Sequence, residues 1–161
     1  MKTINITSGS KDPIAYILSN LAHTPFSYGG YTFKCVEAPL QGIKIENKVE
    51  RERVFAMDGL SALKIGRKIT RAVKDGEERF VYWEGKKIPY NSQDHRLLIV
   101  SFIGEKVRQN PEVQKALIET KDKFIYHDVG PEHPKTSLPE KLFIEILLAK
   151  RKILLKLKNL K

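Results

Sequence analysis

Short stretches of alternating apolar and polar residues mark a few strands along the chain. Residues 2–7 alternate and are rich in β-branched side chains, and residues 123–127 show a similar pattern, so each predicts a short strand. Residues 25–33 predict two extended pieces around a turn at Gly29 and Gly30. Residues 80–90 predict a hairpin whose turn spans residues 84–87. The strands are few and short.

Longer segments with helical spacing separate these strands. Asp58 predicts the start of a helix over residues 59–69, and Asn91 or Ser92 starts a long helix to residue 108. Residues 111–120 form another, and the motif at residues 137–140 predicts a capping box that opens the last helix. Residues 8–13 form a loop. The fold class expected is a helix-rich α+β single domain over residues 1–161, with residues 139–161 as a basic amphipathic terminal helix.

Length and composition narrow the class of protein. A chain of 161 residues with 41% hydrophobic residues can bury one core. The N-terminus lacks an apolar signal segment, and the longest apolar run, at residues 144–149, is too short to cross a bilayer. The single cysteine, Cys35, fits a reducing compartment and is interpreted as a small apolar residue. We therefore expect a soluble cytoplasmic protein (in the host cytoplasm if it is viral) without a membrane partner, a metal or a cofactor.

A formal net charge of +10 indicates polyanionic partners or phosphorylated substrates. The excess is concentrated at the C-terminal end, where Lys156, Lys158 and Lys161 alternate with leucines. Such a basic amphipathic segment can contact nucleic acid or an anionic membrane, but a terminal helix with one packed face is the favoured interpretation. A small basic nucleic-acid-binding domain remains an alternative for the whole chain.

One polar row stands out. Glu37, Gln41 and Lys44 have the spacing of one helix face, and an apolar stripe of Val36, Leu40 and Ile43 runs beside it. The helix is therefore expected to pack on one side and to present the polar row, which is either solvated or lines a cleft.

Several short motifs in order carry a family resemblance. They are Ser-Asn-Leu-Ala at residues 19–22, Gly-Tyr-Thr-Phe at 30–33, the polar row of residues 37–44, residues 62–67 ending in Gly-Arg, Trp83, and a block at residues 105–120 containing Gln-Asn-Pro. Together they resemble the NADAR, or YbiA-like, superfamily from about residue 18 to residue 151. The resemblance implies a YbiA-like fold.

It also implies a chemistry. YbiA-like proteins cleave N-glycosidic bonds of ribosyl groups, in riboflavin-pathway intermediates or in ADP-ribosylated guanine of nucleic acid. Such cleavage passes through an oxocarbenium-like state that needs a carboxylate and a positioned water. The resemblance makes Glu37 that carboxylate. The expected ligand is a phosphorylated ribosyl or ADP-ribosyl compound, with modified nucleic acid as a further partner.

The other candidate residues have roles on the substrate, each beside a structural alternative. Asn20 orients the substrate or closes its own turn. Gln41 and Lys44 hold Glu37 or reach a phosphate. Arg67 clamps phosphate or balances a helix end, and Trp83 stacks on a base or belongs to the core.

The chain departs from the family near its C-terminal end. Residues 126–137 lack the family's Trp-Gly-Asp element, so Asp128 or Glu132 replaces the acid and Tyr126 or His127 replaces the aromatic residue. Asp128 is taken as the second catalytic residue. The leading hypothesis is an N-glycosidase. The alternative is a non-catalytic module on the same scaffold that binds ADP-ribose, an NAD derivative or nucleic acid.

Overall fold

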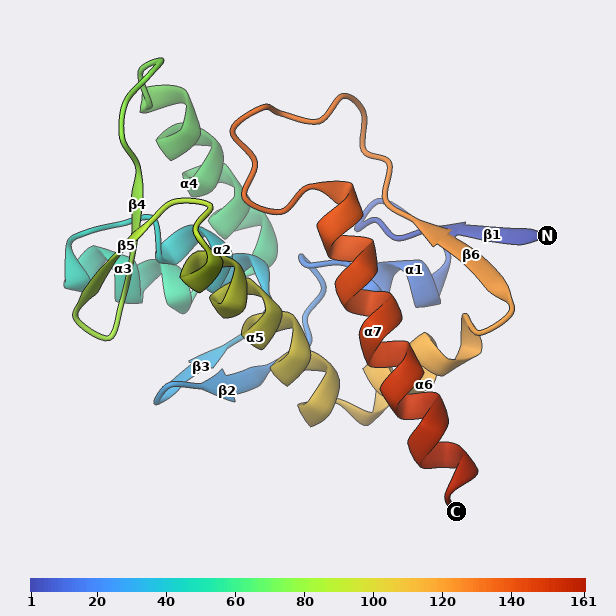
Figure 1. The fold of residues 1–161 in the computed structure, drawn as a ribbon. Coiled ribbons are helices and arrows are strands. Elements are labelled where there is room, and N and C mark those ends of the chain that lie inside the picture. The colour runs from blue at the N-terminus through green and yellow to red at the C-terminus, as the bar shows by residue number, and fades with distance from the viewer.

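Two strands from distant parts of the sequence pair in one small sheet. In the computed structural model, which describes residues 1–161, strand β1 (Lys2–Asn5) pairs in parallel with β6 (Lys123–Tyr126) (Figure 1). Two antiparallel hairpins, β2–β3 (Phe26–Tyr28, Tyr31–Phe33) and β4–β5 (Phe80–Trp83, Lys86–Pro89), form separate two-stranded sheets. All of the predicted strands are confirmed.

Both hairpins have two-residue turns. Gly29 and Gly30 have φ values of 61° and 83°, and Glu84 and Gly85 have values of 48° and 76°. Positive φ at both central residues is typical of the turn that matches the twist of a tight hairpin, which explains the glycines. The second turn therefore comprises Glu84 and Gly85 alone, which is shorter than the expected turn over residues 84–87.

Seven helices account for most of the remaining chain: α1 (Pro13–Leu18), α2 (Glu37–Gly42), α3 (Lys48–Phe55), α4 (Gly59–Ala72), α5 (Gln93–Gln109), α6 (Pro111–Glu119) and α7 (Glu140–Asn159). The predicted starts of α4 and α5 are confirmed, since Asp58 accepts a hydrogen bond from the Ser61 amide and Ser92 accepts one from His95. Helices α1 and α3 were not predicted.

The start of α7 differs from the prediction. Pro139 occupies the N-cap position without a side-chain cap, and the Glu132 carboxylate accepts a hydrogen bond of 2.9 Å from the Glu140 amide. The capping box expected from Ser137 to Glu140 is therefore wrong. A carboxylate eight residues upstream satisfies this amide instead.

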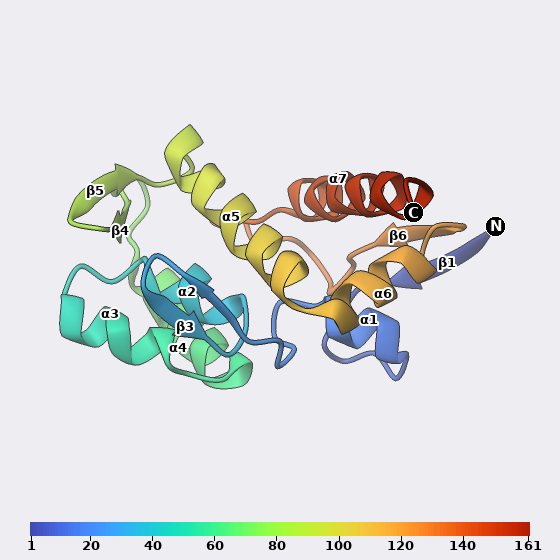
Figure 2. The ribbon, with the colours of Figure 1, turned by 90° about the horizontal axis from the view of Figure 1, so that it is seen from below.

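Helix α5 runs through the centre of the molecule. Figure 2 shows it between one half that holds α2, α3 and α4 and another half that holds α1, α7 and the β1–β6 sheet. Its side chains Ile99, Phe102 and Ile103 are almost fully buried in a core of 25 residues. The architecture is the helix-rich α+β fold that the sequence predicts.

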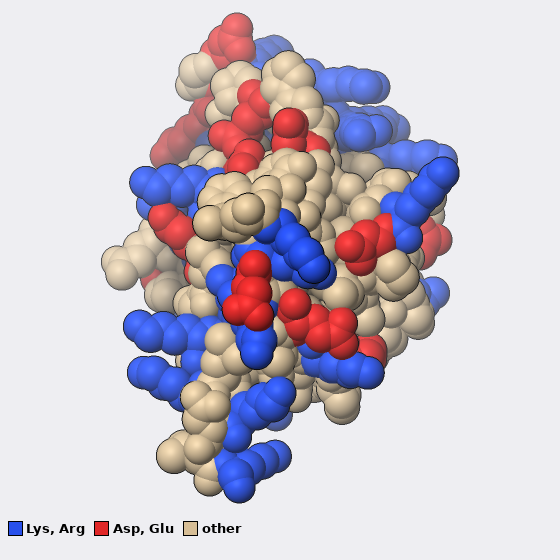
Figure 3. Space-filling model, turned by 90° about the vertical axis from the view of Figure 1, so that its right-hand side faces the viewer, with Lys and Arg blue, Asp and Glu red and all other residues tan.

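Helix α7 leaves the core towards its C-terminal end. Phe143 and Leu147 are buried, whereas Leu157 and Leu160 are 53% and 83% exposed. Figure 3 shows Lys and Arg side chains gathered at the lower end of the molecule, where α7 ends. None of the helices combines the length and apolar character needed to span a membrane.

Candidate active site

A cavity of about 560 Å³ lies where α2, α4, the turn at residues 19–21 and the segment after β6 come together. Its lining is mainly polar. Glu37 is the one carboxylate that lines it, surrounded by basic side chains, which are Lys44, Arg67, Arg71, His127, His133 and Lys135. A single acid among so many cations suits an anionic ligand that reacts beside the carboxylate.

Glu37 begins α2 and is only 6% exposed. Its backbone amide donates a hydrogen bond of 3.0 Å to the carbonyl of Asn20, which ties α2 to the turn at residues 19–21. Burial raises the pKa of the Glu37 carboxyl, against the lowering effects of the Gln41 hydrogen bond and of nearby Lys44. A buried carboxyl with a raised pKa in a cavity is typical of a general acid or base.

Two further residues hold that carboxylate in place. The Lys44 ammonium donates a hydrogen bond of 2.8 Å to Gln41 Oε1, and Gln41 Nε2 donates one of 2.6 Å to Glu37 Oε1. Because an ammonium can only donate, Lys44 fixes which end of the Gln41 amide faces Glu37. Burial, followed by repulsion from Arg79, lowers the Lys44 pKa to about 8.

Helix α4 lines the side of the cavity next to Gln41. Gly66 faces Gln41 so closely that a Cβ at this position would collide with the side-chain amide. Arg67 and Arg71, one turn apart on α4, also line the cavity and form no ion pair with an acidic side chain. Their guanidinium groups are available to an anionic ligand such as phosphate.

Asn20 lines the cavity from the turn at residues 19–21, and a buried lysine fixes that turn. The ammonium of Lys106, itself 2% exposed, donates a hydrogen bond of 2.7 Å to the carbonyl of Ser19. Burial lowers the Lys106 pKa to about 7. Lys106 is a positioning residue that sequence reasoning missed, although it lies in the Gln-Asn-Pro block.

Other side chains of the Gln-Asn-Pro block also have structural roles. Asn110 donates to the carbonyl of Pro25, and Gln109 exchanges hydrogen bonds with the backbone of Ser27. These side chains therefore fasten the β2–β3 region to the end of α5.

Two of the predicted site residues lie elsewhere. Trp83 is buried in an aromatic cluster, with ring centroids 5.6 Å from both Tyr28 and Phe102, and does not line the cavity. Its position corresponds to the core alternative rather than to stacking on a base. The remaining substrate-binding candidates, Asn20, Gln41, Lys44 and Arg67, do line the cavity with Glu37.

Asp128 is the other displaced candidate. It is exposed, its carboxylate accepts a hydrogen bond of 3.0 Å from the Gly130 amide, and its backbone is paired with Asn5. It does not line the cavity, whereas its neighbour His127 does. The expectation of a second acid in the cavity is therefore not met by Asp128.

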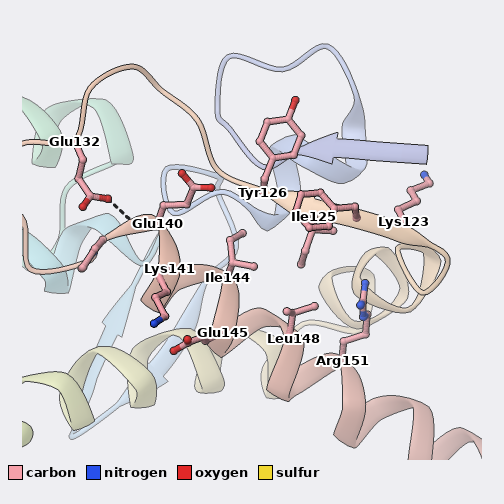
Figure 4. Close-up of a pocket in the computed structure, with 12 residues that line it drawn as sticks. Lys123, Ile125, Tyr126, Glu132, Glu140, Lys141, Ile144, Glu145, Leu148 and Arg151 are labelled. Carbon is pink, nitrogen blue, oxygen red and sulfur yellow. Dashed lines mark hydrogen bonds between the residues drawn. The ribbon is translucent and has the colours of Figure 1, made fainter. Parts of the chain in front are cut away.

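A second hollow, of about 580 Å³, lies between β6 and α7 (Figure 4). Glu132 and Tyr126, the other candidates from the departing region, line this hollow, and Figure 4 shows Glu132 bound to the start of α7. Neither Glu37 nor any of the predicted substrate-binding residues lines this hollow. Nowhere in the chain do three or more His, Cys, Asp or Glu side chains cluster so that they could hold a metal ion.

Comparisons with known proteins agree with this architecture. The model of the family described as bacteriophage protein GP30.3 matches residues 13–152. An uncharacterized 17.1 kDa protein in the Gp30–rIII intergenic region of Enterobacteria phage T4 is 32% identical over 149 residues, which cover 91% of this chain and 95% of that protein.

A solved structure shows the same fold. The NMR structure of the Escherichia coli protein YbiA superposes with a TM-score of 0.66 at 19% identity, covering 99% of this chain and 88% of YbiA. The similarity confirms the YbiA-like fold expected from the sequence.

Proposed function

The chain belongs to the bacteriophage protein GP30.3 family, and we propose that it is a hydrolase that cleaves an N-glycosidic bond of a ribosyl or ADP-ribosyl compound. The YbiA-like fold supports a place among possible N-glycosidases. The proposed substrates are ADP-ribosylated guanine in nucleic acid or a phosphoribosyl intermediate like those of the riboflavin pathway.

One observation carries the proposal. Glu37 is a buried carboxylate whose orientation is fixed by Gln41, in a cavity whose other ionisable lining residues are all basic. A fixed negative charge next to the anomeric carbon would stabilise the oxocarbenium-like transition state, because it needs no reorganisation when positive charge develops. The same carboxylate, with its raised pKa, would accept a proton from the attacking water.

The cations would bind the rest of the substrate. Arg67 and Arg71 would hold phosphate oxygens, since a guanidinium can bind two oxygens of one phosphate. Lys44 would act mainly through Gln41, by keeping the amide turned towards Glu37. Asn20 would hydrogen-bond a ribose hydroxyl or the edge of a base.

The position of Asp128 favours a second candidate function. With one carboxylate in the cavity rather than the expected pair, the same scaffold would suit a non-catalytic module that binds ADP-ribose, an NAD derivative or modified nucleic acid. Since a relative of this chain belongs to a bacteriophage, we propose that either function would be exercised in the cytoplasm of the infected host.

One experiment separates these functions. The protein is incubated with nucleic acid carrying ADP-ribosylguanine and, separately, with phosphoribosylamino-pyrimidine, and mass spectrometry follows the released ribosyl product. The hydrolase releases product from one of them at catalytic turnover. Saturable binding without release would identify the non-catalytic module, and neither binding nor release would refute both.

A further inference from the structure

His127 follows β6 and is fixed by an unusual backbone contact. Its Nδ1 lies 2.6 Å from the carbonyl oxygen of Ile6, and its ring packs edge-on against Phe143 with centroids 5.2 Å apart. A carbonyl oxygen can only accept a hydrogen bond, so Nδ1 must carry the hydrogen. Any proton that His127 gains or loses is therefore on Nε2.

That second nitrogen is free to act. His127 lines the cavity, and Nε2 has no hydrogen-bond partner in the protein. It is not sealed off either, since the one buried side-chain nitrogen or oxygen without a partner in the chain is Nε2 of His95. His127 also lies near enough to Glu37 that a positive charge on its ring weakly opposes the effect of burial, which raises the pKa of that carboxyl.

The cavity lacks another carboxylic acid that could protonate a leaving group. Glu37 is its one carboxylate, and Asp128 points to solvent-exposed backbone instead. A ribosyl C–N bond breaks slowly when the nitrogen leaves without a proton, because negative charge then builds up on it. We propose that His127 is the general acid that protonates the leaving nitrogen, an inference that rests on the N-glycosidase function proposed above.

The step balances with these two groups. The C1–N bond breaks with its electron pair passing to nitrogen, which takes the proton from Nε2 of the His127 imidazolium. Water adds to C1 through its oxygen and gives a proton to the Glu37 carboxylate. Glu37 then returns this proton to His127 through solvent, so that the net reaction adds one water molecule across the C1–N bond.

The other charged groups that line the cavity are Glu37, Lys44, Arg67, Arg71, His133 and Lys135. Of these, His133 is the other imidazole, and it fits the role of general acid less well. Nδ1 of the exposed His133 accepts a hydrogen bond of 3.1 Å from the Lys135 amide, so protonation of that nitrogen would break the contact. His127 keeps its bond to Ile6 in both protonation states, because Nδ1 remains protonated throughout.

A pair of leaving groups tests the proposal. The wild type, His127→Gln and the control His23→Gln, at an exposed histidine outside the cavity, are assayed on a phosphoribosyl N-glycoside and on 4-nitrophenyl ribofuranoside 5-phosphate. The nitrophenolate leaves as a stable anion and needs no proton. Gln can still donate a hydrogen bond to the Ile6 carbonyl but cannot act as an acid. We expect His127→Gln to lose roughly 100-fold or more in kcat on the N-glycoside and to change little on the nitrophenyl compound. The control His23→Gln should resemble the wild type on both.

The outcomes separate this inference from the function on which it rests. Equal losses of His127→Gln on both compounds, or no loss on the N-glycoside, would overturn the role of His127 alone. If the wild type cleaves neither compound, the N-glycosidase proposal fails and this inference fails with it. A second measurement needs no variant: ¹⁵N NMR of neutral His127 in the wild type should show a proton on Nδ1, and a proton on Nε2 would overturn the proposal.

Discussion

The side-chain amide of Gln41 donates a 2.6 Å hydrogen bond to the buried carboxylate of Glu37. Lys44 completes the row by binding the oxygen of the same amide. The polar row that the helical spacing predicted thus lines a cavity instead of facing bulk solvent.

Gly66 should be essential for the position of the Gln41 side chain. Gly66→Ala would push a Cβ into the Gln41 amide, so we expect a loss of about 1–3 kcal/mol in the free energy of unfolding and a fall in activity. Gly104→Ala is the matched control, because its Cβ would meet the flexible end of Lys150 at 3.1 Å. It should be neutral or stabilise the helix by about 0.5–1 kcal/mol. Denaturant unfolding of the two variants checks this, and equal effects would contradict it.

Lys106 should make stability depend on pH in the alkaline range. Its pKa falls from 10.5 to about 7 on folding because of burial, so between these values the unfolded chain binds the extra proton. Stability should therefore rise as the pH increases from about 7 towards 10.5 and be lost as it falls back. In Lys106→Met this rise should be weaker. Thermal melting across that range measures it, and identical slopes in both proteins would rule out the assignment.

Arg67 should contribute to binding more than to the chemical step. Arg67→Ala would remove the proposed phosphate contact, which lies away from the reacting carbon, so KM should rise roughly tenfold while kcat changes less. The control neutralises Lys156 and Lys158, at the exposed end of α7, and Lys161, just after it. It should alter neither constant with a small substrate. Should the control instead weaken binding of nucleic-acid substrates in a salt-dependent way, the end of α7 would contact the polyanion.

Activity should survive removal of metal ions. No cluster of donor side chains in the chain suits a metal ion, and the proposed mechanism relies on the Glu37 carboxylate to position water. Turnover should be unchanged after exhaustive treatment with EDTA. Loss of turnover that a divalent cation restores would show that the mechanism is incomplete.

The sequence predicts the elements whose signals are local. Asp58 and Ser92 act as caps within three residues of their partners, and the Gly29–Gly30 turn needs no distant contact. Helices α1 and α3 escaped prediction because they are only six and eight residues long, although Asp12 and Asn47 cap them.

Local sequence signals likewise predict only part of the site. Glu37, Gln41 and Lys44 lie within eight residues of one another, so their spacing brings them together. The single helix predicted to carry all three ends at Gly42, however, and Lys44 follows it in a turn. By contrast, Lys106 acts on a carbonyl 87 residues away and His127 on one 121 residues away. Which of His127 and Asp128 faces the cavity depends on how the segment after β6 meets β1, which no local pattern encodes.

The most direct test of the account is the turnover of Glu37→Gln. This variant keeps the shape of the side chain and a hydrogen bond with Gln41 but loses the charge that the transition state requires. Burial raises the pKa of Glu37, so at neutral pH the variant should melt at the same temperature as the wild type or higher, with the difference vanishing in acid where the carboxyl is protonated in both states. The account predicts a loss of about 100-fold or more in kcat on the ribosyl N-glycoside with this intact fold. Wild-type turnover in a normally folded Glu37→Gln variant would contradict it.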